Sequence, residues 1–109
     1  MYSIYKYRLD KPEIVITGPI VKWLYIDYHS LERCLCAWVA VDLEAEDKSF
    51  KVLKLKTGEK FDGEVLRNYQ YMRTMNWNTY IEHIFVGEID SETGEVKKKE
   101  KGVDYVDNL

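Results

Sequence analysis

The stretch "CLCAWVAVDL", residues 34 to 43, decides how the rest of the chain is interpreted. In a β-strand, successive side chains point to opposite sides of the sheet. Alternate side chains then form two apolar rows, which are Cys34, Cys36, Trp38 and Ala40 on one side and Leu35, Ala37, Val39 and Val41 on the other. Because neither row carries a charge, we expect this strand to be the most deeply buried of the chain.

Strand patterns continue on both sides of this stretch. Residues 3–9 and 13–17 are separated by "DKP" and predict a hairpin, and residues 20–29, apolar on both faces, predict a central strand. Residues 50–57 alternate less cleanly, which a bulge or a sheet edge would explain. Residues 79–89 predict the strand that closes the sheet. The ambiguous run from residue 64 to 75 favours a short helical turn followed by a strand.

Together these patterns predict an all-β or mostly β protein. We expect a small antiparallel sandwich or partly open barrel of about six or seven strands, with one short helix near residues 63–69 as an option. Residues 1–89 form the single β domain in this interpretation. From residue 90 to 109 the large hydrophobic residues give way to mixed charges, which predicts a C-terminal arm or hairpin.

The composition excludes several classes of protein. The chain has 109 residues, of which 46% are hydrophobic, so it is too apolar to be disordered. Its formal net charge of −3 argues against nonspecific binding to nucleic acid, which needs a basic face. The sequence shows neither a secretory signal nor an apolar run long enough to span a membrane. We therefore expect a cytosolic protein without a membrane partner.

The two cysteines predict buried thiols. Cys34 and Cys36 are two residues apart, so on a strand they share a face and are poorly placed to bridge each other. A zinc site that includes His29 and His83 is the alternative, but known zinc patterns separate their cysteines by two to four residues. We expect reduced, inaccessible thiols and no metal.

Motifs that carry catalysis are not found in the sequence. The chain contains no Gly-x-Ser-x-Gly elbow, no phosphate-cradling Gly-x-x-x-x-Gly-Lys and no His-Glu-x-x-His pattern. We therefore expect a protein that is not an enzyme, with no catalytic residues and no cofactor.

The run "NYQYMRTMNWN", residues 68–78, is the strongest candidate for a binding site. On a regular strand Tyr69, Tyr71 and Arg73 project from one face, and Trp77 stands at the adjoining turn. Aromatic rings stack on nucleobases, and an arginine fork binds phosphate. The same residue types form hot spots for protein binding, or simply cover a small sheet with their polar tips in water.

Three further residues are candidates for contacts with a ligand. His83 shares a face with Ile81 and is either a half-buried histidine or a titratable contact. Lys6 and Arg8 lie on the face of their strand opposite Tyr5 and Tyr7, so we expect them to face solvent or a partner subunit. They would join a pocket only by meeting the Tyr71 and Arg73 region from another strand or another chain. With aromatic surface and an edge strand left to cover, we expect a homo-oligomer.

Several strand motifs resemble a family of small, uncharacterised tailed-phage proteins. The matching residues span positions 4 to 88 and are "IYKY" at Ile4–Tyr7, "LCAWVAVD" at Leu35–Asp42, Phe50, "TG" at Thr57 and Gly58, Tyr71, Thr74, and "HIF" at His83–Phe85. The chain departs from this family because it lacks the Pro that usually follows the aspartate matched by Asp42. It also has a longer connection after the "TG" and a C-terminal extension.

The resemblance implies a mostly β phage accessory protein that acts in the cytoplasm of an infected cell. Such proteins often counter host defence, so the first hypothesis is a noncatalytic binder that sequesters a nucleotide immune signal. The second is a protein–protein inhibitor of a host factor that uses the same aromatic surface. A small structural phage protein is the third.

Overall fold

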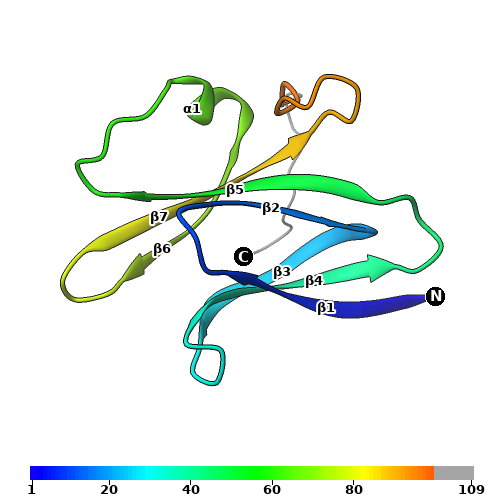
Figure 1. The fold of residues 1–109 in the computed structure, drawn as a ribbon, viewed down its shortest axis with the longest axis horizontal. Helices are drawn as coiled ribbons and strands as arrows, with labels where there is room; N and C mark the ends of the chain where they lie inside the picture. Colours follow the sequence, from blue (N-terminus) through cyan, green and yellow to red (C-terminus); the bar gives the residue numbers. More distant parts are fainter. Residues whose placement is uncertain (100–109) are drawn as a thin grey trace.

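Within residues 1–99, the chain folds into strands with a single short helix. A computed structural model describes residues 1–99 (Figure 1). The elements in chain order are β1 (Tyr2–Leu9), β2 (Glu13–Gly18), β3 (Ile20–His29), β4 (Cys34–Asp42), β5 (Lys48–Lys56), α1 (Glu64–Asn68), β6 (Gln70–Asn76) and β7 (Ile81–Ile89). Within these residues no helix has the length and apolar character needed to cross a membrane.

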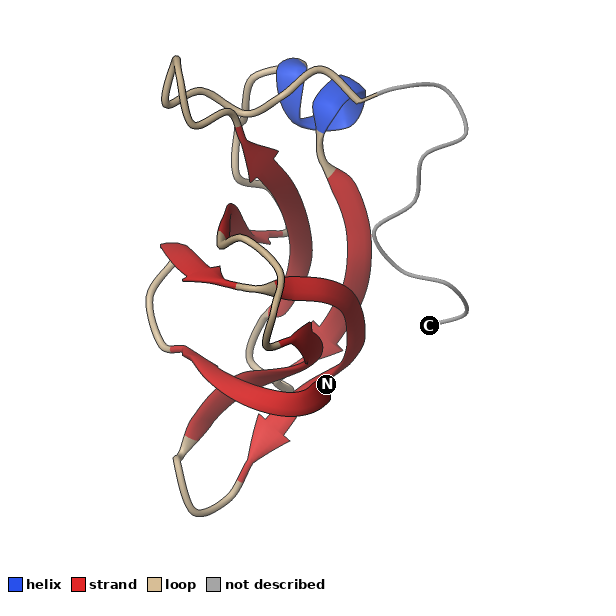
Figure 2. Ribbon diagram, turned by 90° about the vertical axis from the view of Figure 1, so that its right-hand side faces the viewer, coloured by secondary structure: helices blue, strands red, loops and turns tan. Residues whose placement is uncertain are grey.

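Two antiparallel sheets pack as a sandwich. One sheet has the order β1-β4-β3 and the other the order β2-β5-β7-β6. Figure 2 shows the two layers from the side, with α1 at one end. This architecture confirms the predicted all-β sandwich, and α1 confirms the short helix near residues 63–69.

The first two strands do not lie in one sheet, as the predicted hairpin required. β1 and β2 are not a hairpin, because β1 pairs with β4 and β2 pairs with β5 in the other sheet. The connection through Pro12 crosses between the layers, where the Pro12 carbonyl accepts a hydrogen bond from the Lys54 amide at 2.8 Å. A hairpin and a crossing connection of this length look alike in the sequence.

β3 and β5 also exchange their predicted positions. Among residues 1–99, β3 is an edge strand that pairs only with β4, and two register shifts, around Ile20/Lys22 and Trp23/Tyr25, interrupt that pairing. β5 is central, between β2 and β7, in spite of its lysines. Lys54 explains how this is possible, because its ammonium group donates to the Leu9 carbonyl at 2.6 Å in the opposite sheet. β7 is likewise central rather than the closing strand.

The core lies between the two sheets and is centred on Trp23. The apolar row of β4 that faces inward is fully buried, as predicted, and its members are Leu35, Ala37, Val39 and Val41. Trp23 meets the ring of Phe50 edge-on at 5.6 Å across the sandwich. Its indole N–H has no hydrogen-bond partner among residues 1–99. This buried N–H is therefore a polar group that the apolar packing around Trp23 leaves unsatisfied.

The described part of the C-terminal segment folds back on β7. The Asp90 amide donates to the Glu95 carbonyl at 2.7 Å, and Val96 forms an isolated bridge with Ile89. Val96 lies so close to Gly87 that a Cβ at that position would be 2.6 Å from a Val96 methyl group. The segment as far as Lys97 thus forms a hairpin, and the rest of the predicted arm, residues 100–109, lies outside the described residues.

Candidate ligand-binding cleft

A hollow of about 670 Å³ opens where the edge strands β3 and β6 meet, and we call it the β3–β6 cleft. The residues that line it are Leu24, Tyr25, Ile26, Tyr71, Met72, Arg73 and Thr74. They are apolar or aromatic except for one cation and one hydroxyl. The cleft contains two of the residues proposed from the sequence, Tyr71 and Arg73.

A bulge in β6 sets the direction of Arg73. Tyr71 pairs with Phe85 of β7, but Arg73 pairs with Ile84, so one extra residue lies between them. On a regular strand both side chains would share a face, as the sequence predicted, whereas the bulge turns Arg73 to the other face. There the Nη1 group donates to the Ile26 carbonyl and lies 3.4 Å from an Asp27 carboxylate oxygen.

Asp27 holds two side chains of the cleft in place. Its carboxylate accepts a hydrogen bond from the Tyr25 hydroxyl at 2.6 Å and one from the Tyr28 amide at 2.8 Å. The Tyr25 hydrogen bond, the Tyr28 amide and the charge of Arg73 lower the pKa of Asp27, against the opposing effect of burial. Arg73 lies over the Tyr25 ring, 5.8 Å from its centroid. Asp27 is thus an anion at neutral pH that orients both Tyr25 and Arg73.

A second hollow adjoins the cleft at Tyr71, and we call it the Phe85 hollow. It measures about 290 Å³ and is lined by Leu55, Lys56, Thr57, Gly58, Glu59, Phe61, Tyr71, His83 and Phe85. The Tyr71 ring meets the Phe85 ring edge-on at 5.7 Å. Tyr71 therefore forms part of the wall of both hollows.

A chain of hydrogen bonds fixes Tyr71 and His83. The Tyr71 hydroxyl lies 2.6 Å from the Thr74 hydroxyl, which in turn lies 3.0 Å from Nδ1 of His83. Nε2 of His83 lies 2.8 Å from the Thr57 hydroxyl. Both nitrogens of this half-buried histidine are thus engaged, as in the structural alternative considered from the sequence. His83 borders the Phe85 hollow and does not line the β3–β6 cleft.

Tyr69 and Trp77 lie outside both hollows. Tyr69 follows α1 and is buried with its ring against Gly87, and this burial raises the pKa of Tyr69 to about 12. Trp77 packs against the core, and its indole N–H donates to Glu82 at 3.3 Å. The predicted four-residue constellation is therefore divided, with Tyr71 and Arg73 at the cleft and Tyr69 and Trp77 used in packing.

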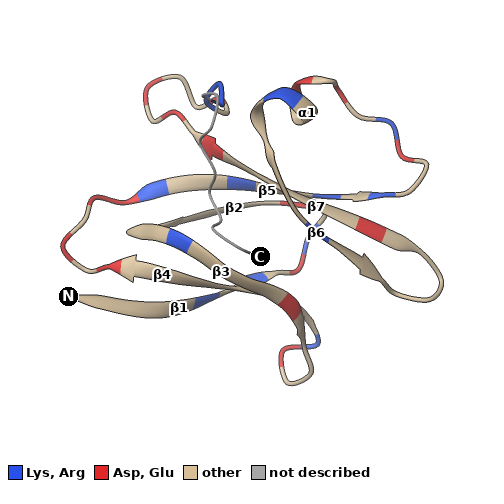
Figure 3. Ribbon diagram, turned by 180° about the vertical axis from the view of Figure 1, so that it is seen from behind, with Lys and Arg blue, Asp and Glu red and all other residues tan. Residues whose placement is uncertain are grey.

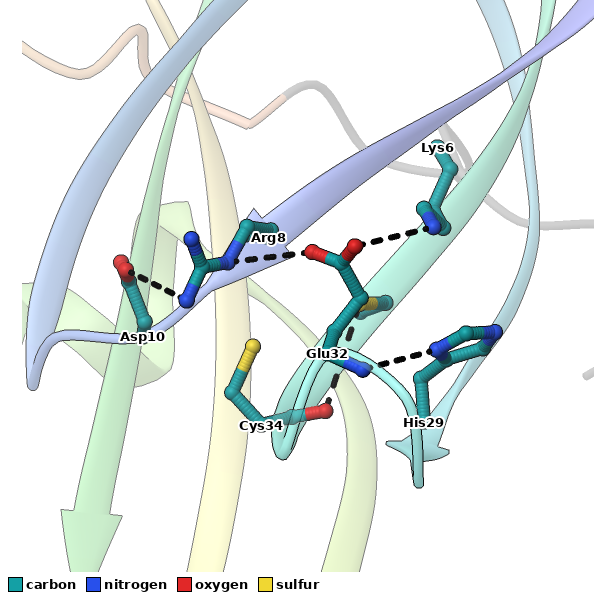
Figure 4. Close-up of polar contacts among 7 residues, drawn as sticks. Lys6, Arg8, Asp10, His29, Glu32 and Cys34 are labelled. Atoms are coloured by element: carbon teal, nitrogen blue, oxygen red, sulfur yellow. Dashed lines mark hydrogen bonds and ion pairs between the residues drawn. The ribbon is translucent and has the colours of Figure 1, made fainter.

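Lys6 and Arg8 are also remote from the cleft. They lie on β1, which is separated from β3 by β4. Glu32 lies between them, 3.4 Å from the Lys6 ammonium and 3.2 Å from Nε of Arg8 (Figure 4). Contact with the Cys34 side chain, together with the charges of Asp10 and Glu32, raises the pKa of Arg8. Figure 3 shows basic and acidic residues interspersed along the strands of both sheets.

The residues considered for zinc do not converge. Within residues 1–99 no group of three or more His, Cys, Asp or Glu side chains is placed to hold a metal ion. Both cysteines are free thiols. Cys36 is buried, and that burial, with a contribution from Cys34, raises its pKa to about 11. Cys34 is half-buried, so the prediction that both thiols are inaccessible is wrong for this residue.

Labelling of the native protein with a thiol reagent is expected to distinguish the two cysteines. Cys34 should react in the folded state, whereas Cys36 should react only on unfolding, because burial hides it and disfavours its thiolate. Mass spectrometry of peptides after a timed reaction, with a Cys34→Ser variant as control, measures this. Equal labelling rates of the two thiols would contradict the expected burial.

Sequence reasoning missed Tyr25 and Asp27. Both lie on β3, which was expected to be a central strand with no open edge. The signal that was available is their spacing, since a tyrosine and an aspartate two residues apart on a strand share a face. Their role depends on β6 lying beside β3, which no local pattern reports.

Comparison with known proteins yields no relative. The chain matches no protein-family model, and no curated protein or solved structure matches it significantly.

Proposed function

We propose that the protein is a noncatalytic binding protein of a tailed phage that sequesters a nucleotide-type signal of host defence in the β3–β6 cleft. The observation that carries this proposal is the convergence of Tyr25, Tyr71 and Arg73 on one concave site of about 670 Å³. That volume lies within the usual range of ligand pockets, roughly 300 to 1,000 Å³. The phage context comes from the resemblance of the strand motifs.

The chemistry of the cleft favours a ligand with a planar ring and one phosphate. Tyrosine rings stack on any nucleobase, because every base presents a π-face. Arg73 uses Nη1 for Ile26 and Asp27, and its other guanidinium N–H groups have no partner among residues 1–99, so they are open to a phosphate oxygen. Because Arg73 is the one cation among the described residues that line the cleft, and Asp27 offsets part of its charge, a ligand with several phosphates fits less well.

The lining of the cleft also supports binding without turnover. Among residues 1–99, the lining contains no histidine or cysteine, and the adjoining carboxylate of Asp27 is engaged by Tyr25 and Arg73. Thr74, the one aliphatic hydroxyl of this lining, is bonded to Tyr71 and His83. His83, the base beside Thr74, lines the Phe85 hollow and not the β3–β6 cleft. The Thr74 hydroxyl itself lies 2.6 Å from the Tyr71 hydroxyl on the other side. We therefore infer that a bound nucleotide is released unchanged.

Titration calorimetry against a panel of cyclic and ADP-ribose-type nucleotides tests the proposal. We expect one nucleotide to bind and Tyr71→Ala to weaken it by about 1 to 3 kcal/mol, a factor of roughly 5 to 150. Arg73→Ala should weaken binding at least as much. Tyr80→Ala is the matched control, because Tyr80 is an exposed tyrosine that lines neither hollow and should leave affinity unchanged. Absence of heat with every nucleotide, or chemical change in the one recovered, would refute the proposal.

One observation favours the second candidate, an inhibitor that binds a host protein. The Phe85 hollow continues the cleft past Tyr71 with a mostly apolar wall that includes Phe61 and Phe85, and an anchor side chain of a protein fits such a hollow. This candidate predicts that no nucleotide binds. It also predicts that a host protein binds the wild type and no longer binds Phe61→Ala. Phe61 does not line the β3–β6 cleft, so the same variant should leave nucleotide binding intact if the first candidate is correct.

A further inference from the structure

One edge of the sandwich is long, regular and open. Among residues 1–99, β1 pairs only with β4, and its register runs from Tyr2 to Leu9 without a bulge. The strand contains no proline. Natural edge strands are usually shortened, bulged or interrupted, because an unprotected edge pairs with other strands.

The hydrogen bonds at the start of β1 show which backbone groups are open. The Leu43 amide donates to the Met1 carbonyl at 2.9 Å, so Met1 and Leu43 form a hydrogen-bonded pair of the ladder. Such pairs alternate with non-hydrogen-bonded ones in an antiparallel ladder. In agreement, the amide of the next residue, Asp42, points away from β1 and donates to the Pro19 carbonyl at 3.0 Å. The outward groups of β1 therefore belong to Tyr2, Ile4, Lys6 and Arg8.

The other three edge strands are protected. β3 and β6 each carry a bulge, and they face each other at the cleft. β2 is shorter than β1, and the same ladder argument, from the bond between Lys54 and Pro12, leaves only Glu13, Val15 and Thr17 facing outward. The Thr17 carbonyl already accepts a hydrogen bond from the Tyr7 hydroxyl at 3.3 Å. β1 is thus the longest edge strand without a bulge in the part of the chain that the structure describes.

We propose that β1 pairs antiparallel with β1 of a second copy of this chain, about a twofold axis between the two Tyr5 residues. The two three-stranded sheets then join into one sheet of six strands. This proposal is independent of the proposed ligand, because β1 and β3 lie at opposite edges of their sheet.

The open groups and the charges select the register. In such a dimer, each residue whose backbone groups face outward must lie opposite an outward-facing residue of the partner. The twofold axis must therefore pass beside a residue of β1 and not between two residues. An axis at Lys6 would place two lysines directly opposite each other, which is unfavourable. An axis at Ile4 would leave Arg8 without an opposite residue. The axis at Tyr5 pairs all four outward residues, with Ile4 opposite the partner's Lys6 and Tyr2 opposite the partner's Arg8.

Burial and charge at this edge suit the same partner. Tyr2 is 72% exposed and Ile4 is 62% exposed, so the end of β1 leaves large apolar surface uncovered. In the chosen register these residues cover the aliphatic stems of the partner's Lys6 and the partner's Arg8. Glu32 offsets the charge of both basic side chains within each copy (Figure 4). Two such edges therefore meet without an excess of positive charge at the axis.

The mass in solution tests the proposal directly. At about 100 µM, where a complex with a Kd of about 1 µM is nearly complete, sedimentation equilibrium should give twice the chain mass of 13.0 kDa. Ile4→Lys places a lysine opposite the partner's Lys6 twice per dimer and should weaken association by about tenfold or more. Val15→Lys, on the exposed edge strand β2, is the matched control and should leave the mass unchanged. A wild-type mass of 13.0 kDa, or equal effects of the two variants, would overturn the proposal.

Disulfide cross-linking tests the register. Tyr5 is in a hydrogen-bonded pair with β4, so it would form a non-hydrogen-bonded pair with the partner's Tyr5, at a Cα distance of about 4.5 Å that a disulfide can span. Tyr5→Cys should therefore give a covalent dimer on oxidation. Ser3→Cys lies opposite the partner's Tyr7 and should not, and the wild type reports any background from Cys34. Cross-linking through Ser3→Cys but not through Tyr5→Cys would exclude the proposed axis.

Discussion

Trp23→Ala is expected to lower the free energy of unfolding by about 3 to 5 kcal/mol, the range for removing a large aromatic side chain from a core. Trp23 is 1% exposed and is the largest fully buried side chain described. Its ring joins the two layers through the edge-on contact with Phe50. The cavity left by alanine cannot close easily, because both walls are strands already paired within their own sheets. Since whole domains are stable by only about 5 to 15 kcal/mol, this loss is large.

Urea denaturation followed by far-UV circular dichroism measures the effect. Trp23→Phe should recover most of the stability, because the indole N–H that it removes has no partner and its loss breaks no hydrogen bond. Trp38→Ala is the matched control, since Trp38 is only half-buried on the outer face of its sheet, and it should cost clearly less. If the two alanine variants were equally unstable, the core would not be centred on Trp23.

Local sequence patterns were sufficient to predict the strands of this fold but not the order in which they pair. The alternation of β4 and the position of α1 follow from side-chain type within about ten residues. The sheet that each strand joins depends on partners such as β1 and β4, which are more than 25 positions apart for every pair in the register. β3 was expected to be central because both its faces are apolar, but it is an edge strand whose Val21, Tyr25 and Tyr28 side chains remain about half exposed.

The candidate site was predicted only in part, because strand pairing also determines which of its residues lie together. Tyr71 and Arg73 were identified by residue type, and they do line one cleft. Their expected common face was wrong, because the bulge at this point is set by pairing with β7. Trp77 was expected at an open turn, but the register places Glu82 inward, where its carboxylate accepts the Trp77 indole N–H. The residue types thus indicated the chemistry of the site, and strand pairing determined which of these residues line it.

Asp27→Ala should destabilise the fold by about 2 to 4 kcal/mol and disorganise the β3–β6 cleft. The carboxylate accepts hydrogen bonds from Tyr25 and from the Tyr28 amide, and bonds to a charged acceptor are worth about 1.5 to 3 kcal/mol each. Its removal also leaves Arg73 without its ion-pair partner. Asp10→Ala is the matched control, because Asp10 forms only an exposed pair with Arg8, and exposed pairs contribute about 0 to 1 kcal/mol.

The pH dependence of stability separates the charge of Asp27 from its packing. The pKa of Asp27 is lowered in the folded protein from its ordinary value of 3.8, so folding favours the ionised carboxylate. The stability that the ionised Asp27 contributes is complete above the ordinary pKa. It is lost as the pH falls through the lower pKa of the folded protein. Between about pH 5 and pH 2, the wild type should therefore lose more stability than Asp27→Ala, and the difference between them should narrow. If the difference in stability between the wild type and Asp27→Ala stayed constant over this pH range, Asp27 would support the cleft by its shape. Its charge would then not hold Tyr25 and Arg73.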